Sequence, residues 1–162
     1  MRTVVFLCDH DEQGSVGFVI NRPFEQRLDE FIPDLEGFSI PVFYGGPVQT
    51  DTLHFLHNLP HLIEGGQPVN DGVYWGGNFT QVVALIKSRQ LDLTKIRFFL
   101  GYSGWSKGQL ADELQEKSWL TSIGNSHLVF QLQPGDIWRA AIRQLDESYH
   151  EIMNYPIDPQ LN

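Results

Sequence analysis

The chain of 162 residues has little cysteine, little positive charge and no long hydrophobic run. Its single cysteine, Cys8, excludes an internal disulfide and is typical of a reducing compartment. The apolar run from Thr3 to Cys8 is too short for a signal peptide, and no run approaches the roughly 20 apolar residues of a membrane-spanning helix. We therefore expect a cytoplasmic protein without a membrane partner.

Positive charge is too scarce for a nucleic-acid surface. The formal net charge is −9; residues 1–72 carry 11 acidic and 3 basic residues, and the 8 basic residues of 73–162 are scattered. Phosphate backbones are bound by clustered Lys and Arg side chains. We expect no direct nucleic-acid binding and no role at a membrane surface.

Size and composition predict a single domain over residues 1–162. With 41% hydrophobic and 19% charged residues, the chain can bury a core without disulfides or metals. No linker or low-complexity segment divides it. Residues 155–162, which contain Pro156 and Pro159, are predicted to form an extended tail.

Short β-rich runs outnumber helical patterns along the chain. Helices are predicted after Asn78, Ser106 and Gly135, with one or two short helical turns between residues 28 and 35. Strands are predicted at 4–8, 16–20, 41–44, 52–57, 73–75, 96–100, 119–123 and 127–132. The run 96–100 is apolar throughout, so we expect it to be central and buried on both faces. The pattern predicts an α+β fold with a mixed, largely antiparallel sheet.

A set of aromatic and polar residues beside glycines forms the candidate binding site. Strands that stop at glycines can gather their loops at one edge of a sheet, and apolar walls with few polar groups are typical of small-ligand and peptide sites. The alternative is that these aromatics belong to the core and the glycines permit close packing. The candidate residues are Tyr44, Tyr74, Trp75, Asn78, Tyr102, Ser103, Gly104, Trp105 and Ser106.

Ser103 is the candidate nucleophile of an enzymatic alternative. The nucleophile elbow of hydrolases, G-x-S-x-G, requires a glycine where this chain has Trp105. Its downstream partners would come from Asp112, Asp136 and His127. The same segment lacks the glycine patterns of nucleotide-binding loops, although the start of the following helix could hold an anion.

Histidines and Cys8 are the other reactive candidates. His54 and His57 have odd spacing, which places them on opposite faces of a strand, and Pro60 prevents one helix from carrying both of them and His61. We therefore expect no bound metal and no cofactor. Cys8 ends an apolar strand beside acidic residues, so we expect a buried thiol with a raised pKa rather than a reactive partner of His10.

Seven sequence motifs, taken in their order along the chain, resemble those of a known protein family. They are Thr3–His10 (TVVFLCDH), Gly17–Pro23 (GFVINRP), Tyr44–Val48 (YGGPV), Leu53–His57 (LHFLH), Asp71–Phe79 (DGVYWGGNF), Arg97–Trp105 (RFFLGYSGW) and Gly108–Leu110 (GQL). Between about residues 2 and 145 the chain resembles the bacterial YqgE/AlgH family. The resemblance implies a sheet curled into a barrel-like core with flanking helices. Family members usually carry a further stretch before the first strand, and the tail 150–162 diverges from their pattern.

The family resemblance implies no established activity and no catalytic residues. Some members are described as transcriptional regulators, through a link to alginate control. We expect a non-enzymatic binding or regulatory protein that acts through protein or small-ligand contacts; the alternative is a hydrolase that uses the Ser103 loop. An unpaired first strand also predicts a homodimer at high concentration.

Overall fold

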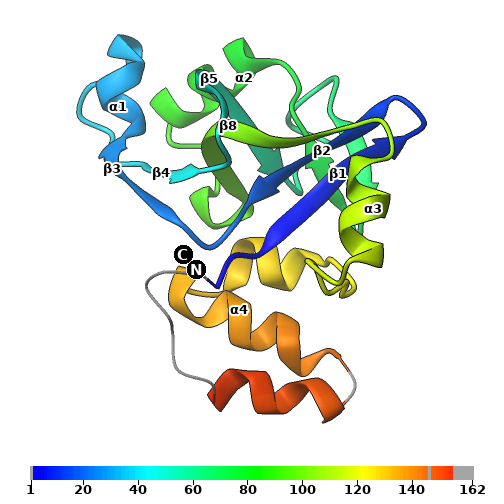
Figure 1. Ribbon diagram of the computed structural model, residues 1–162. Coiled ribbons are helices and arrows are strands. Elements are labelled where there is room, and N and C mark those ends of the chain that lie inside the picture. Colours follow the sequence, from blue (N-terminus) through cyan, green and yellow to red (C-terminus); the bar gives the residue numbers. More distant parts are fainter. Residues whose placement is uncertain (1, 146, 155–162) are drawn as a thin grey trace.

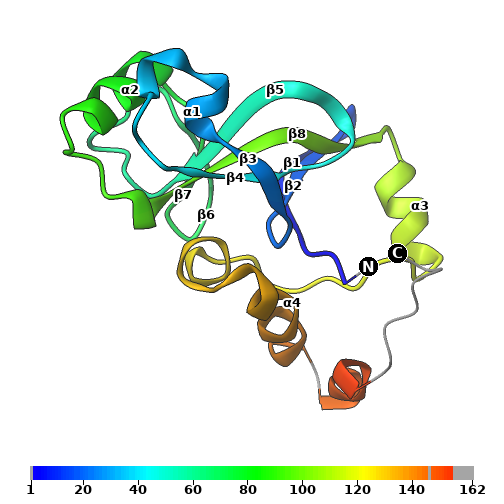
Figure 2. The same cartoon turned by 90° about the vertical axis from the view of Figure 1, so that its left-hand side faces the viewer.

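The computed structural model describes residues 2–145 and 147–154 (Figure 1). In this part of the chain, one sheet has the order β1-β2-β8-β5-β7-β6, with β4 also beside β8 and β3 beside β4. The β4–β8 pair is parallel and the other pairs are antiparallel. The sheet curls until it nearly closes into a barrel, which confirms the predicted α+β class (Figure 2). The strands are β1 (Val5–Asp11), β2 (Gly14–Val19), β3 (Pro23–Arg27), β4 (Pro41–Tyr44), β5 (Val48–His57), β6 (Gln67–Asn70), β7 (Val73–Trp75) and β8 (Ile96–Ser106).

Helices flank the sheet on separate sides. Figures 1 and 2 show α1 and α2 at one end of the sheet and α4 at the other, with α3 beside the β1–β2 hairpin. None of the described helices is long and apolar enough to cross a membrane. The α-helices are α1 (Leu28–Phe31), α2 (Phe79–Lys87), α3 (Gln109–Gln115) and α4 (Pro134–Arg143), and the short turns are η1 (Pro33–Leu35), η2 (Leu93–Lys95), η3 (His127–Gln131) and η4 (Glu147–Asn154).

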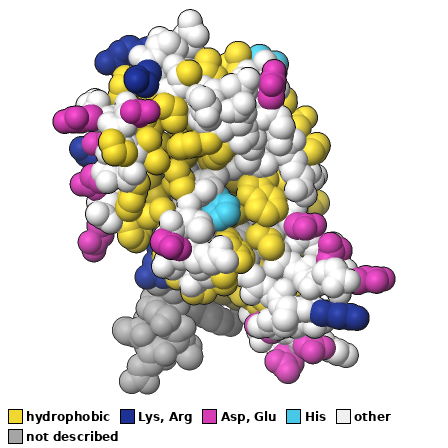
Figure 3. Space-filling view, turned by 90° about the horizontal axis from the view of Figure 1, so that it is seen from above, with side chains coloured by type: hydrophobic (Ala, Val, Ile, Leu, Met, Phe, Trp, Pro, Cys, Tyr) yellow, Lys and Arg dark blue, Asp and Glu magenta, His cyan; other side chains and the backbone are white. Residues whose placement is uncertain are grey.

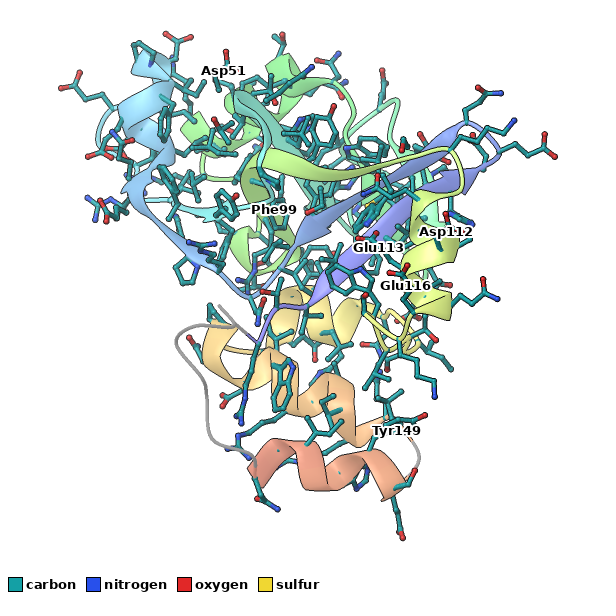
Figure 4. All side chains as sticks on the ribbon, in the orientation of Figure 1. Asp51, Phe99, Asp112, Glu113, Glu116 and Tyr149 are labelled. Carbon is teal, nitrogen blue, oxygen red and sulfur yellow. The ribbon has the colours of Figure 1, made fainter. Side chains whose placement is uncertain are left out.

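Strand β8 lies at the centre of the molecule, as its apolar run predicts. It pairs with β2, β4 and β5. Phe98 and Phe99 are each 1% exposed and belong to different hydrophobic clusters, because neighbouring strand residues point to opposite faces. Figure 4 shows Phe99 in the interior of the sheet. The prediction of a central strand buried on both faces is confirmed.

Glycines allow β8 to continue further than predicted. The segment from Gly101 to Ser106, expected as a loop, is strand. Gly101 has φ +70°, and a side-chain carbon there would lie 2.5 Å from Gly46 O. Gly46 itself packs directly on the backbone of Tyr102. These glycines therefore allow close packing of neighbouring strands, which was the alternative to a binding loop at this position.

Two predicted strands are wrong. Residues 119–125 have no regular structure, and Leu120 and Ile123 are 44% and 76% exposed. Residues 127–131 form a wide helical turn, η3, although a short apolar run also fits a strand. The third predicted helix ends at Arg143, so Tyr149 lies in a separate turn. The predicted tail at 155–162 lies outside the described residues.

Candidate functional site

Two of the predicted site residues meet around one histidine. The ring centroids of Trp75 and Tyr102 lie 6.4 and 5.7 Å from that of His54, and Phe18 lies 5.3 Å from it on the core side. Burial lowers the pKa of His54, and its Nε2 lies 3.1 Å from Thr52 Oγ1. The neutral imidazole is therefore one member of an aromatic layer.

Tyr74 stacks on a different histidine, His57, at 5.8 Å. His57 is completely buried; its Nδ1 accepts from Leu59 N–H at 3.1 Å, and its Nε2 donates to Gly76 O at 2.9 Å. Burial lowers the pKa of His57, so the ring is neutral with both nitrogens engaged. Within residues 2–145 and 147–154, no group of three or more His, Cys, Asp and Glu side chains is arranged to hold a metal.

Three other predicted residues lie apart from this aromatic layer. Tyr44 ends β4, where the Arg22 guanidinium lies 4.5 Å from its ring. Asn78 caps α2 by accepting from Gln81 N–H at 3.1 Å. The sequence Ser106-Lys-Gly-Gln109 predicts a capping box with Ser106 as the N-cap. This prediction is wrong, because α3 begins at Gln109 with Gly108 as its N-cap; Ser106 N–H donates to Gln109 Oε1 at 3.0 Å within the turn before the helix. These side chains serve local structure on separate elements.

Ser103 does not have the surroundings of a nucleophile. Its side chain is 8% exposed, and its Oγ donates to Gly45 O at 3.1 Å. A serine nucleophile instead needs a hydrogen-bonded base and access to substrate. His127, the histidine proposed as that base, has its Nδ1 2.9 Å from Gln131 Oε1 in its own helical turn.

Cys8 is buried, as predicted. Burial, with a further contribution from Asp9, raises the pKa of the Cys8 thiol to about 12. The neighbouring His10 is exposed, and its Nδ1 lies 2.6 Å from Ser15 Oγ rather than beside the thiol. The pair forms no reactive thiol–imidazole couple.

Trp105 lies where two clefts meet. Its ring contacts Trp119 edge-on, with a centroid distance of 6.0 Å. It lines a cleft of about 320 Å³ between β1, α3 and the irregular segment 119–124. It also lines a more open cleft of about 440 Å³, together with Tyr102, Gly104, Asp9 and Asp11.

The first of these clefts continues along β1. A neighbouring cleft of about 490 Å³ lies between Thr3–Phe6, segment 118–124 and α4. We call the two together the β1 groove. Both parts are lined by Val5, Phe6, Trp119, Leu120, Ser122 and Gly124. Sequence reasoning missed this groove because it assigned 119–123 to a strand; the exposed edge predicted for the first strand was the signal that pointed toward it.

Strand β1 is an edge of the sheet and leaves backbone groups unpaired. Val5 lies opposite Val19, whose N–H donates to Gly45 O at 2.8 Å, on the side away from β1. Val5 and Val19 are therefore a non-hydrogen-bonded pair, and so are Leu7 and Gly17 two residues on. The N–H and C=O groups of Val5 and Leu7 point away from β2, and no other strand of the described chain pairs with them.

Hydrophobic side chains border this edge. Leu7, Leu120 and Ile123 are 38%, 44% and 76% exposed, respectively. The register shift between Leu7 and Asp9 places Leu7 and His10 on the same face as Trp105, above the groove. The edge thus combines unpaired backbone groups with apolar surface.

Comparison with known proteins gives the chain its family. The family model described as AlgH-like matches residues 1–150. A UPF0301 protein of Chlorobium limicola is 42% identical over 161 residues, which cover 99% of this chain and 86% of that protein. A UPF0301 protein of Cytophaga hutchinsonii is 37% identical, with 99% and 89% covered.

Two solved structures have the same fold. The solution structure of the AlgH protein from Pseudomonas aeruginosa matches with a TM-score of 0.73 and 28% identity, over 96% of this chain and 85% of that one. A crystal structure of a protein from Corynebacterium diphtheriae also has a TM-score of 0.73, with 17% identity over 91% and 80%. The chain belongs to the AlgH-like family of bacterial proteins, whose function is uncharacterised.

Proposed function

We propose that this protein is a non-catalytic binding protein that captures an extended segment of a partner protein along the free edge of β1. The observation that carries the proposal is the outward direction of the Val5 and Leu7 backbone groups beside the β1 groove. An added strand would pair with these groups, as in other complexes formed by β-augmentation. Natural proteins usually cover or charge such edges.

The groove supplies the apolar part of the interaction. Side chains of an extended segment alternate, so every second one would enter the groove between β1 and segment 118–124. Trp105, Trp119 and the exposed Leu120 line the groove, and they can pack against aliphatic or aromatic side chains of the bound segment. A path formed by two adjoining clefts suits a peptide better than a compact small molecule.

The geometry around Ser103 favours this function over the hydrolase alternative. Its hydroxyl donates to a backbone carbonyl and is nearly buried. Binding through β1 requires no nucleophile and no cofactor, and it accounts for exposed apolar residues that the core does not use. Occupancy of the groove could then regulate the partner without chemistry.

Replacing Val5 tests the proposal. Peptide display against the native protein should enrich extended sequences with alternating apolar residues. Val5→Pro removes an N–H that points outward from an edge strand, a position where proline is tolerated, so the fold should persist. Enriched peptides should bind Val5→Pro at least about tenfold more weakly, because an edge hydrogen bond is lost and the proline ring obstructs the added strand.

Val5→Thr is the matched control, because it keeps the N–H and a β-branched side chain. It should bind the enriched peptides about as well as the native protein. Circular dichroism and thermal melting should show that both variants are folded. Failure to enrich any peptide, or equal binding by folded Val5→Pro, would refute capture along β1.

A further inference from the structure

We infer that a small organic carboxylate with an apolar body binds in a second cleft, beside Arg97, between the sheet and the segment that joins η3 to α4. This site goes beyond the proposed function, because the cleft shares no lining residue with the β1 groove. The inference rests on a partly buried guanidinium that has free donors, no acidic partner among the described residues and apolar side chains beside it.

Arg97 is held in place by the fold. It lies near the start of β8, on the same face of the sheet as Phe99, two residues further on. Its Cζ lies 4.8 Å from the centroid of the Phe43 ring on β4. Its Nη2 donates to Phe130 O at 3.2 Å and to Leu132 O at 3.3 Å, at the end of η3. The guanidinium is therefore positioned before any ligand arrives, which lowers the entropic cost of binding.

Three N–H donors of Arg97 remain available. A guanidinium has five N–H groups, and the two on Nη2 are used by the carbonyls at the end of η3. Nε and Nη1 form no hydrogen bond within residues 2–145 and 147–154, where the ion pair that forms is that of Arg27 with Asp29. Burial lowers the pKa of Arg97. A partly desolvated cation without a counter-ion is stabilised by charge-assisted hydrogen bonds to an anion.

Arg97 lines a cleft of about 800 Å³ between β4, η2 and residues 130–134, which we call the Arg97 cleft. Small-ligand sites usually have volumes of about 300–1,000 Å³. Phe43, Phe130 and Leu132 also line the cleft, and Leu93 adds an apolar side chain that is 44% exposed. The cleft thus combines one fixed cation with surface for an apolar body.

Charges near the Arg97 cleft favour an anion. Lys95 also lines the cleft, whereas none of the lining residues is Asp or Glu. Three carboxylates on neighbouring elements, Glu25 on β3, Asp92 before η2 and Asp136 in the first turn of α4, are exposed and line no part of it. Asp92 offsets part of the charge on Lys95. Arg97 is therefore the cation that would hold the ligand.

Most of the protein surface would repel an anion. The net charge is −9, and Figure 3 shows acidic side chains around the edge of one face with few Lys or Arg among them. Long-range attraction therefore contributes little, and short-range contacts in the Arg97 cleft must hold the ligand. Apolar contacts supply them, which favours an organic acid over a bare inorganic anion.

One negative charge matches this cleft better than two. Arg97 is the partly buried cation, whereas Lys95 is exposed and interacts with Asp92. A carboxylate carries a single charge, and a phosphate monoester carries about 1.5 to 2 negative charges at neutral pH. Moving a second charge from water into an apolar cleft is costly without a second buried cation. A carboxylate is therefore the expected anionic group.

Four probes test the inference by nuclear magnetic resonance of the backbone amides. They are hydrocinnamate, its neutral amide, acetate and phenyl phosphate. Titration with hydrocinnamate should shift the amide signals of Thr94 and Gln131, which line the cleft. The neutral amide lacks the charge and acetate lacks the apolar body, so each should bind at least about tenfold more weakly. Phenyl phosphate should bind no more tightly than hydrocinnamate.

A charge-removing variant locates the carboxylate. Arg97→Gln should weaken hydrocinnamate binding at least about tenfold. Arg89→Gln is the matched control, because Arg89 also packs on a phenylalanine ring, that of Phe38 at 5.1 Å, but lines no part of the Arg97 cleft. This control should bind hydrocinnamate as the native protein does. Circular dichroism and thermal melting show whether each variant is folded.

A second variant leaves the contacts of Arg97 with η3 in place. Leu93→Ala removes a side chain that is 44% exposed, so the fold should persist and hydrocinnamate should bind about threefold more weakly. Leu62→Ala is its control, since Leu62 is 37% exposed and lines no part of the Arg97 cleft. Leu62→Ala should leave the affinity unchanged.

The outcomes also separate this inference from capture along β1. Equal binding of hydrocinnamate and its amide, unchanged affinity in folded Arg97→Gln and Leu93→Ala, tighter binding of phenyl phosphate, or binding of none of the probes would each overturn the carboxylate site. Val5→Pro should bind hydrocinnamate as well as the native protein does. Loss of hydrocinnamate binding in folded Val5→Pro would place the ligand in the β1 groove and also overturn the inference. Absence of peptide binding would refute capture along β1 without affecting the carboxylate site.

Discussion

Truncation of two tryptophans distinguishes core from groove. Trp75 packs against the main hydrophobic cluster, with Phe18 edge-on at 5.7 Å. Trp105 packs edge-on against Trp119 and faces two clefts. Replacing a fully buried Trp by Ala costs about 3–5 kcal/mol, and an edge-to-face pair contributes about 0.5–1.5 kcal/mol of such a loss. Because both residues are half-buried, we expect about 2–4 kcal/mol for Trp75→Ala and about 1–2 kcal/mol for Trp105→Ala.

Urea unfolding followed by far-ultraviolet circular dichroism measures these costs without depending on tryptophan fluorescence. At this chain length, about 1 kcal/mol corresponds to a shift of roughly 2–4 °C in melting temperature, so Trp75→Ala should melt roughly 4–16 °C early. Trp105→Ala should melt roughly 2–8 °C early, less than Trp75→Ala under the same conditions, and bind peptide more weakly. An equal or larger loss for Trp105→Ala, with an unchanged urea dependence, would show that Trp105 is a core residue and refute its place in the groove.

Three further changes have definite expected outcomes. Ser103→Ala should lower the free energy of unfolding, measured with urea, by about 1 kcal/mol, because the hydrogen bond to Gly45 O is lost. A fluorophosphonate probe should not label Ser103 in the native protein. Labelling of the native protein that Ser103→Ala abolishes would favour the hydrolase alternative. Burial lowers the pKa values of His54 and His57 from 6.5, so as the pH falls the unfolded chain binds protons before the folded protein does. The free energy of unfolding should therefore decrease below about pH 6.5, and the urea midpoint should be lower at about pH 5.5 than at about pH 7.5. His54→Phe should show a smaller drop, and an equal drop in that variant would exclude His54 as a cause. Light scattering at high concentration should detect dimers that Leu7→Lys removes; a protein that stays monomeric throughout would count against association through β1.

The centre of the fold could be predicted because its sequence signal is local. The apolar run at 96–100 identifies β8, and the turn between residues 9 and 14 identifies the β1–β2 hairpin. The continuation of β8 to Ser106 could not be predicted, because a glycine after an apolar run usually marks the end of a strand. Only the fold shows that Gly101 permits the close approach of Gly46. Exposed β3 lacks apolar alternation and gave no strand signal.

Only part of the candidate site could be predicted. Trp75 and Tyr102 do come together, but around His54, which was weighed from the sequence only as a metal ligand and rejected. The path of segment 119–124 depends on distant partners: Asn70 Nδ2 donates to Gly124 O at 2.6 Å, and Gln144 Nε2 donates to Ile123 O at 2.9 Å. Such long-range contacts leave no periodic pattern, so the groove becomes visible only in the fold.

Site-resolved amide hydrogen exchange tests the central claim most directly. Val5 and Leu7 have outward N–H groups, whereas Phe6 lies opposite Phe18 in a hydrogen-bonded pair. In the free protein, the Val5 and Leu7 amides should exchange faster than that of Phe6. A saturating peptide selected for binding should slow both by at least about tenfold, since each gains a strand partner. Unchanged exchange at Val5 and Leu7 in the saturated complex would contradict capture along β1.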